Sequence, residues 1–170
     1  RDIMEELYAA SSAGVKIDLV VRGICSLVPG VGGMSDNITV RSIVGRYLEH
    51  SRVFRFGEGD KAEYFIGSAD LMERNLSGRV EVLVPIRDRR LRTRLEELLR
   101  VCMADDSLAW RLEGTTWEKI PTMAGINAHV RFQALAHGRS QGALPDPDTA
   151  ADPAEPVIVA AGGIVTKETK

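Results

Sequence analysis

Apolar residues near the start of the chain first follow a helical spacing and then form a continuous run. Residues 2–13 place Ile3 and Leu7 at helical spacing, and Gly14 is suited to end the helix. Residues 15–21 (VKIDLVV) are mostly aliphatic, which predicts a buried strand. A helix and a strand joined by a tight glycine turn indicate a mixed or parallel α/β sheet.

The middle of the chain alternates short apolar runs with turns. Aliphatic and aromatic residues predict strands over residues 38–43, 51–56, 62–66 and 79–86. The glycine-containing residues 57–60 predict a hairpin turn between the second and third of these strands. We expect a short helical turn over residues 44–49 and a short helix over residues 70–75.

A longer amphipathic helix follows. Asp88 is a suitable N-cap, and the helical spacing continues to about Met103. Its apolar stripe consists of Leu91, Leu95, Leu98, Leu99 and Cys102. Its other face consists of Arg87, Arg89, Arg90, Arg92, Arg94 and Arg100. Such a basic face is either solvated or binds a polyanion, and the pattern alone leaves both open.

The last third of the chain has a different character. Residues 107–112 and 115–120 are predicted to pair as a hairpin, and residues 127–137 to form a helix. Residues 138–156 are rich in Gly, Pro, Asp and Ala, which predicts disorder. The small apolar residues 157–165 receive no assignment.

Composition narrows the class of protein. The chain has 170 residues, 44% of them hydrophobic and 27% charged, which is typical of a globular domain. The net charge of -2 argues against a nucleic-acid partner. Cys25 and Cys102 lack metal-binding spacing and are predicted to be reduced, buried thiols, while His129 and His137 stand too far apart for a helical metal pair. No apolar run reaches the ~18 residues of a membrane span.

The candidate site combines one histidine with nearby arginines. His50 and Arg52 lie two residues apart at the start of a predicted strand and therefore point to the same face. The next strand leads into the turn at Gly67 and Ser68, and Arg22 follows the carboxyl end of the first strand, where ligands bind in open α/β sheets. Arginine and histidine donors suit a phosphoryl group. The alternative is a surface histidine beside a solvated arginine.

Three stretches resemble a known family. They are residues 13–25 (AGVKIDLVVRGIC), 40–52 (VRSIVGRYLEHSR) and 67–76 (GSADLMERNL). Together they resemble the last catalytic domain of the long bacterial polyphosphate kinases, over roughly residues 2–112 in unbroken order. The resemblance implies a phospholipase D-like mixed β-sheet flanked by helices. It implies an N-terminally truncated domain over residues 1–118 and a variable, partly disordered tail over residues 119–170.

The same resemblance implies a reaction. Polyphosphate kinases reversibly transfer the terminal phosphoryl group of ATP to polyphosphate with magnesium, through a phosphohistidine. That histidine and the magnesium ligands are expected upstream of this chain. Arg22 and His50 match positions that contact the nucleotide and its phosphates: the arginine would neutralise phosphoryl charge, and the histidine would hydrogen-bond a phosphate or act as an acid. Arg41, Ser68 and Arg74 are further candidates.

Two alternatives remain open. His50-Ser51-Arg52 stands where a phospholipase D motif has His-x-Lys, and residues 67–70 stand where it has Gly-Ser-x-Asn. A dimeric phosphodiesterase or nuclease is therefore one alternative, although Arg52 replaces lysine and Gly57 replaces the motif's aspartate. The other is a non-catalytic polyanion-binding domain. We expect a cytoplasmic protein, either free or peripheral to the membrane. We also expect it to be homo-oligomeric at full length and inactive as this chain alone.

Overall fold

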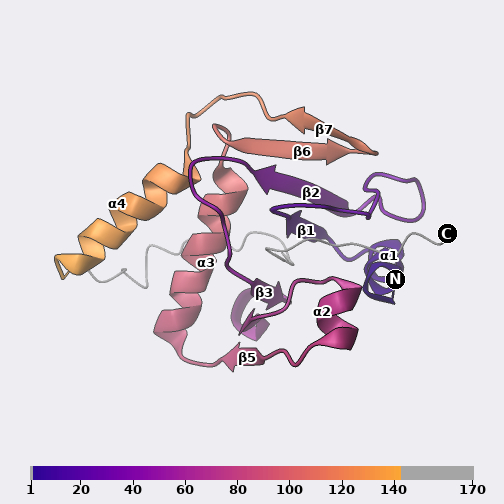
Figure 1. Ribbon diagram of the computed structural model, residues 1–170, viewed down its shortest axis with the longest axis horizontal. Helices are drawn as coiled ribbons and strands as arrows, with labels where there is room; N and C mark the ends of the chain where they lie inside the picture. The colour runs from indigo at the N-terminus through magenta and orange to yellow at the C-terminus, as the bar shows by residue number, and fades with distance from the viewer. Residues whose placement is uncertain (1, 143–170) are drawn as a thin grey trace.

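The strands of the computed structural model form two sheets, and helices lie against both of them (Figure 1). The structure describes residues 2–142. In chain order the elements are α1 (Asp2–Ser12), β1 (Ile17–Val20), β2 (Ile38–Ile43), β3 (Val53–Phe56), η1 (Gly59–Lys61), β4 (Glu63–Gly67), α2 (Glu73–Gly78), β5 (Leu83–Ile86), α3 (Arg89–Ala104), β6 (Ala109–Glu113), β7 (Thr116–Lys119) and α4 (Ala128–Ser140). This is the mixed α/β architecture that the hydrophobic pattern predicts, with the flanking helices that the family resemblance implies.

The first sheet is mixed, with the strand order β1-β2-β6-β7. β1 and β2 run parallel, whereas β2 with β6 and β6 with β7 are antiparallel. The predicted hairpin forms between β6 and β7, and Gly114 in its turn has a φ of 57°. Because β1 and β2 are parallel, both carboxyl ends reach the same edge of the sheet, so the residues that follow them are brought into one region.

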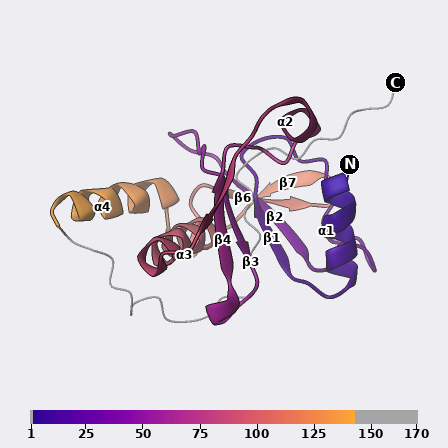
Figure 2. The same cartoon turned by 90° about the horizontal axis from the view of Figure 1, so that it is seen from below.

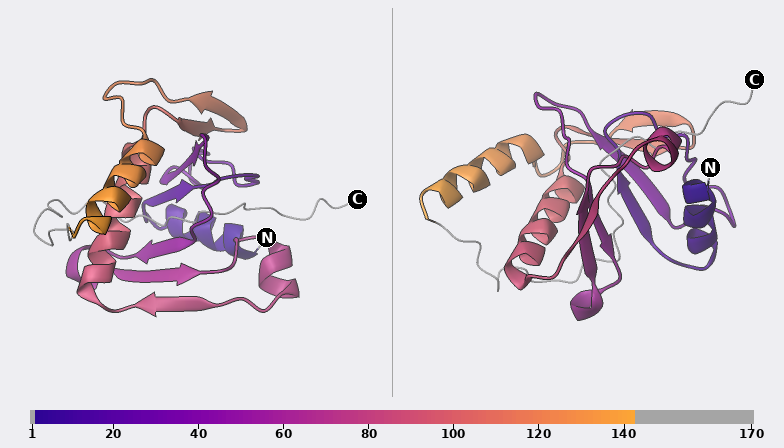
Figure 3. Two further views of the ribbon diagram at one scale, coloured as in Figure 1. Left: turned by 60° about the vertical axis from the view of Figure 1, so that its left-hand side comes forward. Right: turned by 60° about the horizontal axis from the view of Figure 1, so that its bottom comes forward.

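The second sheet is antiparallel throughout, with the strand order β3-β4-β5. β3 and β4 form the predicted hairpin, in which Gly57 has a φ of 80° that side-chain-bearing residues rarely adopt. In Figure 3 this sheet lies beside α3, apart from the hairpin of β6 and β7. Its strands therefore form a separate layer.

Helix α3 connects the two sheets. The Asp88 side chain caps its first turn by accepting a hydrogen bond from the Leu91 N–H at 3.1 Å. Its buried Leu99 and Cys102 pack in one core cluster with residues from both sheets. These partners are Val20, Ile43 and Ala109 of the mixed sheet and Val53 and Tyr64 of the antiparallel sheet. Helix α3 therefore packs against both sheets (Figure 2).

Helix α1 packs against the mixed sheet in a second core cluster. Its Leu7 is buried together with Ile17 and Leu19 of β1 and with Val40 of β2. Ile17 and Leu19 are two residues apart and therefore point to the same face of β1, whereas Val20 belongs to the cluster around α3. The first strand thus buries apolar side chains on both of its faces, as its sequence predicts.

Both cysteines are free thiols, and they differ in burial. Cys102 is buried in the α3 core, and this burial is the main cause that raises its pKa to about 12. Cys25 is only partly buried, which differs from the buried position that we predict for both.

Three predicted elements differ from the structure. Residues 44–49 form no helical turn: residues 45–47 are bends, and Gly45 packs so close to His129 that a Cβ there would lie 2.7 Å from the ring Nδ1. The strand predicted over residues 79–86 begins only at Leu83, where pairing with Gly67 starts. Residues 138–140, predicted to be disordered, form the end of α4. The remainder of the predicted disorder and the apolar segment 157–165 lie outside the described residues.

Candidate phosphate-binding site

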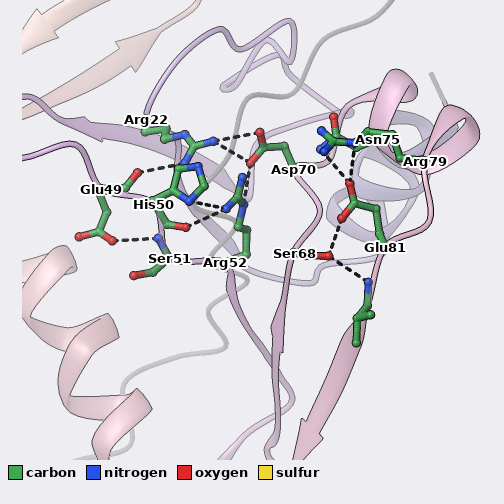
Figure 4. Close-up of polar contacts among 11 residues, drawn as sticks. Arg22, Glu49, His50, Ser51, Arg52, Ser68, Asp70, Asn75, Arg79 and Glu81 are labelled. Carbon is green, nitrogen blue, oxygen red and sulfur yellow. Dashed lines mark hydrogen bonds and ion pairs between the residues drawn. The ribbon is translucent and has the colours of Figure 1, made fainter.

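Residues from both sheets converge on one site (Figure 4). Arg22 comes directly after Val21, whose N–H donates to the Arg41 carbonyl at 2.7 Å and so extends the β1–β2 pairing to the sheet edge. Arg52 leads into β3, and its carbonyl accepts from the Gly67 N–H at 3.0 Å. The end of β4 therefore runs next to Arg52, and the following turn delivers Asp70 to the same place.

The Asp70 carboxylate binds both arginines. Arg22 Nη2 lies 3.1 Å from Asp70 Oδ1 and 3.0 Å from Oδ2, and Arg52 Nε lies 3.0 Å from Oδ1. Asp70 is 6% exposed, and the two arginine side chains are 17% and 11% exposed. One carboxylate between two guanidinium groups leaves an excess of positive charge, which suits an anionic ligand.

Two further contacts fix Arg22 and its surroundings. Arg22 Nη1 donates to the Glu49 carbonyl at 3.2 Å. The Glu49 carboxylate turns the other way and accepts from the Ser51 N–H at 3.0 Å. Arg22 is therefore held by the backbone of Glu49, while the Glu49 carboxylate is engaged by Ser51.

His50 is exposed and is held by Arg52. Arg52 Nη1 lies 2.7 Å from His50 Nδ1 and donates to the His50 carbonyl at 3.0 Å. Arginine remains protonated in proteins and has no acceptor, so Nδ1 must be the acceptor in this contact. A neutral ring then has its proton on Nε2, which leaves an N–H donor at the surface of the site. The predicted pair of Arg22 and His50 therefore lies in one cluster, linked through Arg52 and Asp70.

Ser68 faces a different group. Its hydroxyl donates to the Glu81 carboxylate and accepts from the Val82 N–H at 3.0 Å. Glu81 also accepts from Asn75 at 3.4 Å and pairs with Arg79 at 3.6 Å. In Figure 4 this second cluster lies on the far side of Asp70 from His50. Ser68 therefore supports the turn after β4, and it is not among the groups around His50.

The other two candidate arginines also lie elsewhere. Arg41 on β2 donates to the carbonyls of Cys102 and Met103 at the end of α3. Burial lowers the pKa of the Arg41 guanidinium, although Asp18 and Asp105 act in the opposite direction. Arg74 is exposed on α2. Neither is brought into the cluster with Arg22 and His50.

Sequence reasoning missed Asp70 as the shared partner of two arginines. A signal was present, because Asp70 stands where the related Gly-Ser-x-Asn motif has an amide. A carboxylate at that position accepts hydrogen bonds and cannot donate them, which favours guanidinium partners over phosphate oxygens.

The site does not fit a magnesium ion. Magnesium prefers carboxylate and other oxygen ligands, but both Asp70 oxygens are bound by guanidinium groups. Within residues 2–142 no group of three or more His, Cys, Asp or Glu side chains is arranged to hold a metal ion. No helix in this part of the chain has both the length and the apolar character needed to cross a membrane.

Comparison with known proteins gives a consistent result. The family described as polyphosphate kinase C-terminal domain 2 matches residues 1–133. Polyphosphate kinases of Burkholderia cenocepacia and Paraburkholderia phytofirmans are 54% identical over 111 and 112 residues. Each match covers 65% of this chain and 16% of the relative.

A solved structure extends the likeness to three dimensions. The crystal structure of the polyphosphate kinase from Porphyromonas gingivalis superposes with a TM-score of 0.79 at 37% identity. The match covers 84% of this chain and 22% of that one. The family match extends beyond residue 118 and into α4. The chain therefore belongs to the polyphosphate kinase C-terminal domain 2 family.

Proposed function

We propose that this chain supplies one half of a polyphosphate kinase active site and that Arg22 and His50 bind the phosphates of ATP and polyphosphate there. The observation behind the proposal is the cluster itself. The Arg22 guanidinium from the segment after β1 and the Arg52 guanidinium and His50 imidazole from the segment before β3 are held together through Asp70. Because the chain spans only 16% of its curated relatives, the other half of the site belongs to sequence outside it.

In the proposed reaction the terminal phosphoryl group of ATP passes to a histidine outside this chain and then to a polyphosphate end, leaving ADP. Negative charge spreads over the phosphoryl oxygens during each transfer. The Arg22 guanidinium, already held by Asp70 and the Glu49 carbonyl, faces that charge without having to reorganise. Magnesium is expected to be held by groups outside this chain.

The role of His50 is better described as hydrogen bonding than as acid catalysis. The Arg52 contact requires an unprotonated Nδ1, so the ring that fits this site is neutral with a proton on Nε2. A neutral imidazole is a poor proton donor to a leaving oxygen but a good hydrogen-bond donor to a phosphate oxygen. We therefore favour the phosphate contact of the two roles that the sequence leaves open.

The test is polyphosphate synthesis from ATP and magnesium in a chimaera that joins this chain to the preceding domains of the Burkholderia cenocepacia enzyme. Arg22→Ala and His50→Ala should each lower kcat by about 10²- to 10³-fold, as expected for the loss of one preorganised donor. Arg111→Ala is the matched control, because Arg111 is exposed on β6 and pairs with Glu113. Full activity in both site variants would end the proposal.

The chain alone should not catalyse. Phosphoryl transfer depends on two half-sites holding the reactants in line, and one half is absent from this chain. We expect weak polyphosphate binding and no ATP-dependent synthesis from the isolated chain. We expect the full-length enzyme to be a cytoplasmic homo-oligomer.

A polyanion-docking role is the second candidate, and one observation favours it. Arg87, Arg89 and Arg90 are exposed around the start of α3, where positive charge is unfavourable to the helix dipole. Under this alternative, Arg89→Glu with Arg90→Glu would abolish polyphosphate binding while His50→Ala would preserve it. The active-site proposal predicts the opposite order of effects.

A further inference from the structure

We propose that Asp70 is a positioning residue of this site: it holds Arg22 and Arg52 side by side and, through Arg52, holds His50 with its ring proton on Nε2. The inference rests on the proposed function for its catalytic consequence. The arrangement itself can be tested without any enzymatic assay.

The first step of the argument is that Asp70 is not itself a phosphate ligand. Its carboxylate is buried, each oxygen contacts a guanidinium nitrogen, and a carboxylate repels a phosphate. A buried charge is tolerated when it is paired and hydrogen-bonded, and Arg22 and Arg52 meet that need together. The contacts of Asp70 therefore serve the arginines and not a ligand.

The second step is that the two arginines need Asp70. They come from different sheets, and both bind Asp70 Oδ1, so two like charges meet at one oxygen. Without the carboxylate they would repel one another and regain rotamer freedom. Arg22 would retain its contact to the Glu49 carbonyl, whereas Arg52, with His50 as its remaining partner, would no longer be fixed in one orientation.

The third step connects Asp70 to the imidazole. Arg52 uses Nε for Asp70 and Nη1 for His50. Because the guanidinium group is planar, the contact with Asp70 also sets the orientation of the nitrogen that contacts His50. The guanidinium group is required at this position, because a lysine side chain has a single nitrogen and cannot contact both partners in this way. The tautomer of His50 thus depends on a carboxylate to which it is joined only through Arg52.

The related Gly-Ser-x-Asn motif has an amide at this position, which suggests an informative substitution. Asp70→Asn keeps the size of the side chain and removes its charge. An asparagine has one acceptor oxygen, and its amide group would face a guanidinium donor to donor. We expect Arg52 to lose its fixed orientation while the turn after β4 keeps its shape.

The direct experiment is nitrogen NMR of the 170-residue chain labelled in its histidines, because imidazole nitrogen shifts report the tautomer. The chain has three histidines, so His50→Gln assigns the signal. The wild type should show a neutral His50 with the proton on Nε2. Asp70→Asn and Arg52→Lys should each show exchange between the two tautomers.

Asp106→Asn is the matched control. Asp106 is also buried, but it accepts from backbone N–H groups in the loop before α4. The Asp106→Asn change should lower the free energy of unfolding without altering the His50 signal. Should Asp70→Asn fail to fold, Arg52→Lys still decides the matter, since it keeps the charge at its position. An unchanged His50 tautomer in a folded Asp70→Asn or Arg52→Lys protein would overturn the proposal.

Kinetics of the chimaera separate positioning from a structural role. Asp70→Asn leaves both positive charges near the phosphates, so KM for ATP should stay level or fall. Because the donors are displaced, kcat should fall by about a hundredfold. Asp70→Glu, which retains the charge, should recover part of kcat. Unchanged kcat in Asp70→Asn refutes positioning, whereas unchanged kcat in Arg22→Ala and His50→Ala refutes the proposed function.

Discussion

Two regions of this chain bury carboxylates to a similar degree and use them in opposite ways. Asp70 is 6% exposed and binds the side chains of Arg22 and Arg52. Asp105 and Asp106 are 1% and 8% exposed and accept mainly from backbone N–H groups. Burial of an acid therefore does not mark a site by itself. The kind of partner distinguishes a cluster that can bind a ligand from one that fixes a loop.

The backbone partners show what the second region does. Asp105 accepts from the N–H groups of Leu108, Ala109 and Ala128 at 2.6, 2.9 and 2.6 Å. Asp106 accepts from four consecutive N–H groups, of residues 123–126, at 2.6–3.2 Å. Together these two side chains tie the loop before α4 to the end of α3. These backbone N–H groups are already bound by the two carboxylates, so we describe this region as a scaffold.

The largest effect that separates the two regions is expected for Arg52→Ala. The change removes one partner of Asp70 and the Nδ1 partner of His50, and it leaves the scaffold carboxylates untouched. We expect kcat for polyphosphate synthesis in the chimaera to fall by about 10³-fold, equivalent to about 4 kcal/mol. Steady-state kinetics measures this, with Arg111→Ala as the exposed arginine control. Comparable losses in both variants would contradict the special role of Arg52.

The next largest effect is expected for Asp105→Ala. This change should affect the stability of the fold rather than activity. Three buried or partly buried N–H groups lose their acceptor, which should lower the free energy of unfolding by about 3 kcal/mol. Urea unfolding of the chain measures this value. At low temperature, where the variant remains folded, the His50 tautomer should be unchanged. A shift of the His50 signal in this variant would show that the two regions are coupled.

The sequence predicts the strands and helices better than the site because periodicity is local. The alternation of Ile17, Leu19 and Val21 and the helical stripe of Leu95, Leu98 and Leu99 fix those elements. The pattern fails where tertiary contacts decide. Val80 has strand character but is 99% exposed, and it lies before β5, which pairs with β4 only from Leu83 onwards.

The same distinction between local signals and tertiary contacts explains which site residues the sequence reveals. Arg22 and His50 are recognised from strand ends and from the family resemblance, since both signals are local. Nothing in the sequence indicates that Ser68 turns to Glu81 whereas Asp70, two residues later, turns to the arginines. That outcome depends on where β1 and β3 bring Arg22 and Arg52, which periodicity does not report.

Gly45→Ala tests how closely α4 packs against the bend that follows β2. A Cβ at Gly45 would lie 2.7 Å from His129 Nδ1 and 2.7 Å from Leu108 Cδ1, so the buried His129 must move. We expect the free energy of unfolding to fall by about 2 kcal/mol, as for overpacking in a core. Gly32→Ala, where a Cβ meets nothing within 4 Å, should change it by less than about 0.5 kcal/mol. Equal effects in urea unfolding would argue against the close packing of α4.

The smallest effect is expected at Asp106 and depends on pH. Hydrogen bonds from the backbone, that of Ala124 foremost, hold the pKa of Asp106 below its ordinary value of 3.8. A lowered pKa means that the ionised carboxylate stabilises the folded chain above that ordinary value, and that this contribution is lost as the pH falls through the folded pKa. The effect is small because the loop amides lie in an exposed segment, where water can replace the carboxylate. Urea unfolding at about pH 6 should therefore find Asp106→Asn slightly less stable than the wild type, and the difference should shrink towards about pH 3. A difference that stays constant over this range would mean that Asp106 acts through its shape, and the contrast with the charge-dependent Asp70 would become sharper.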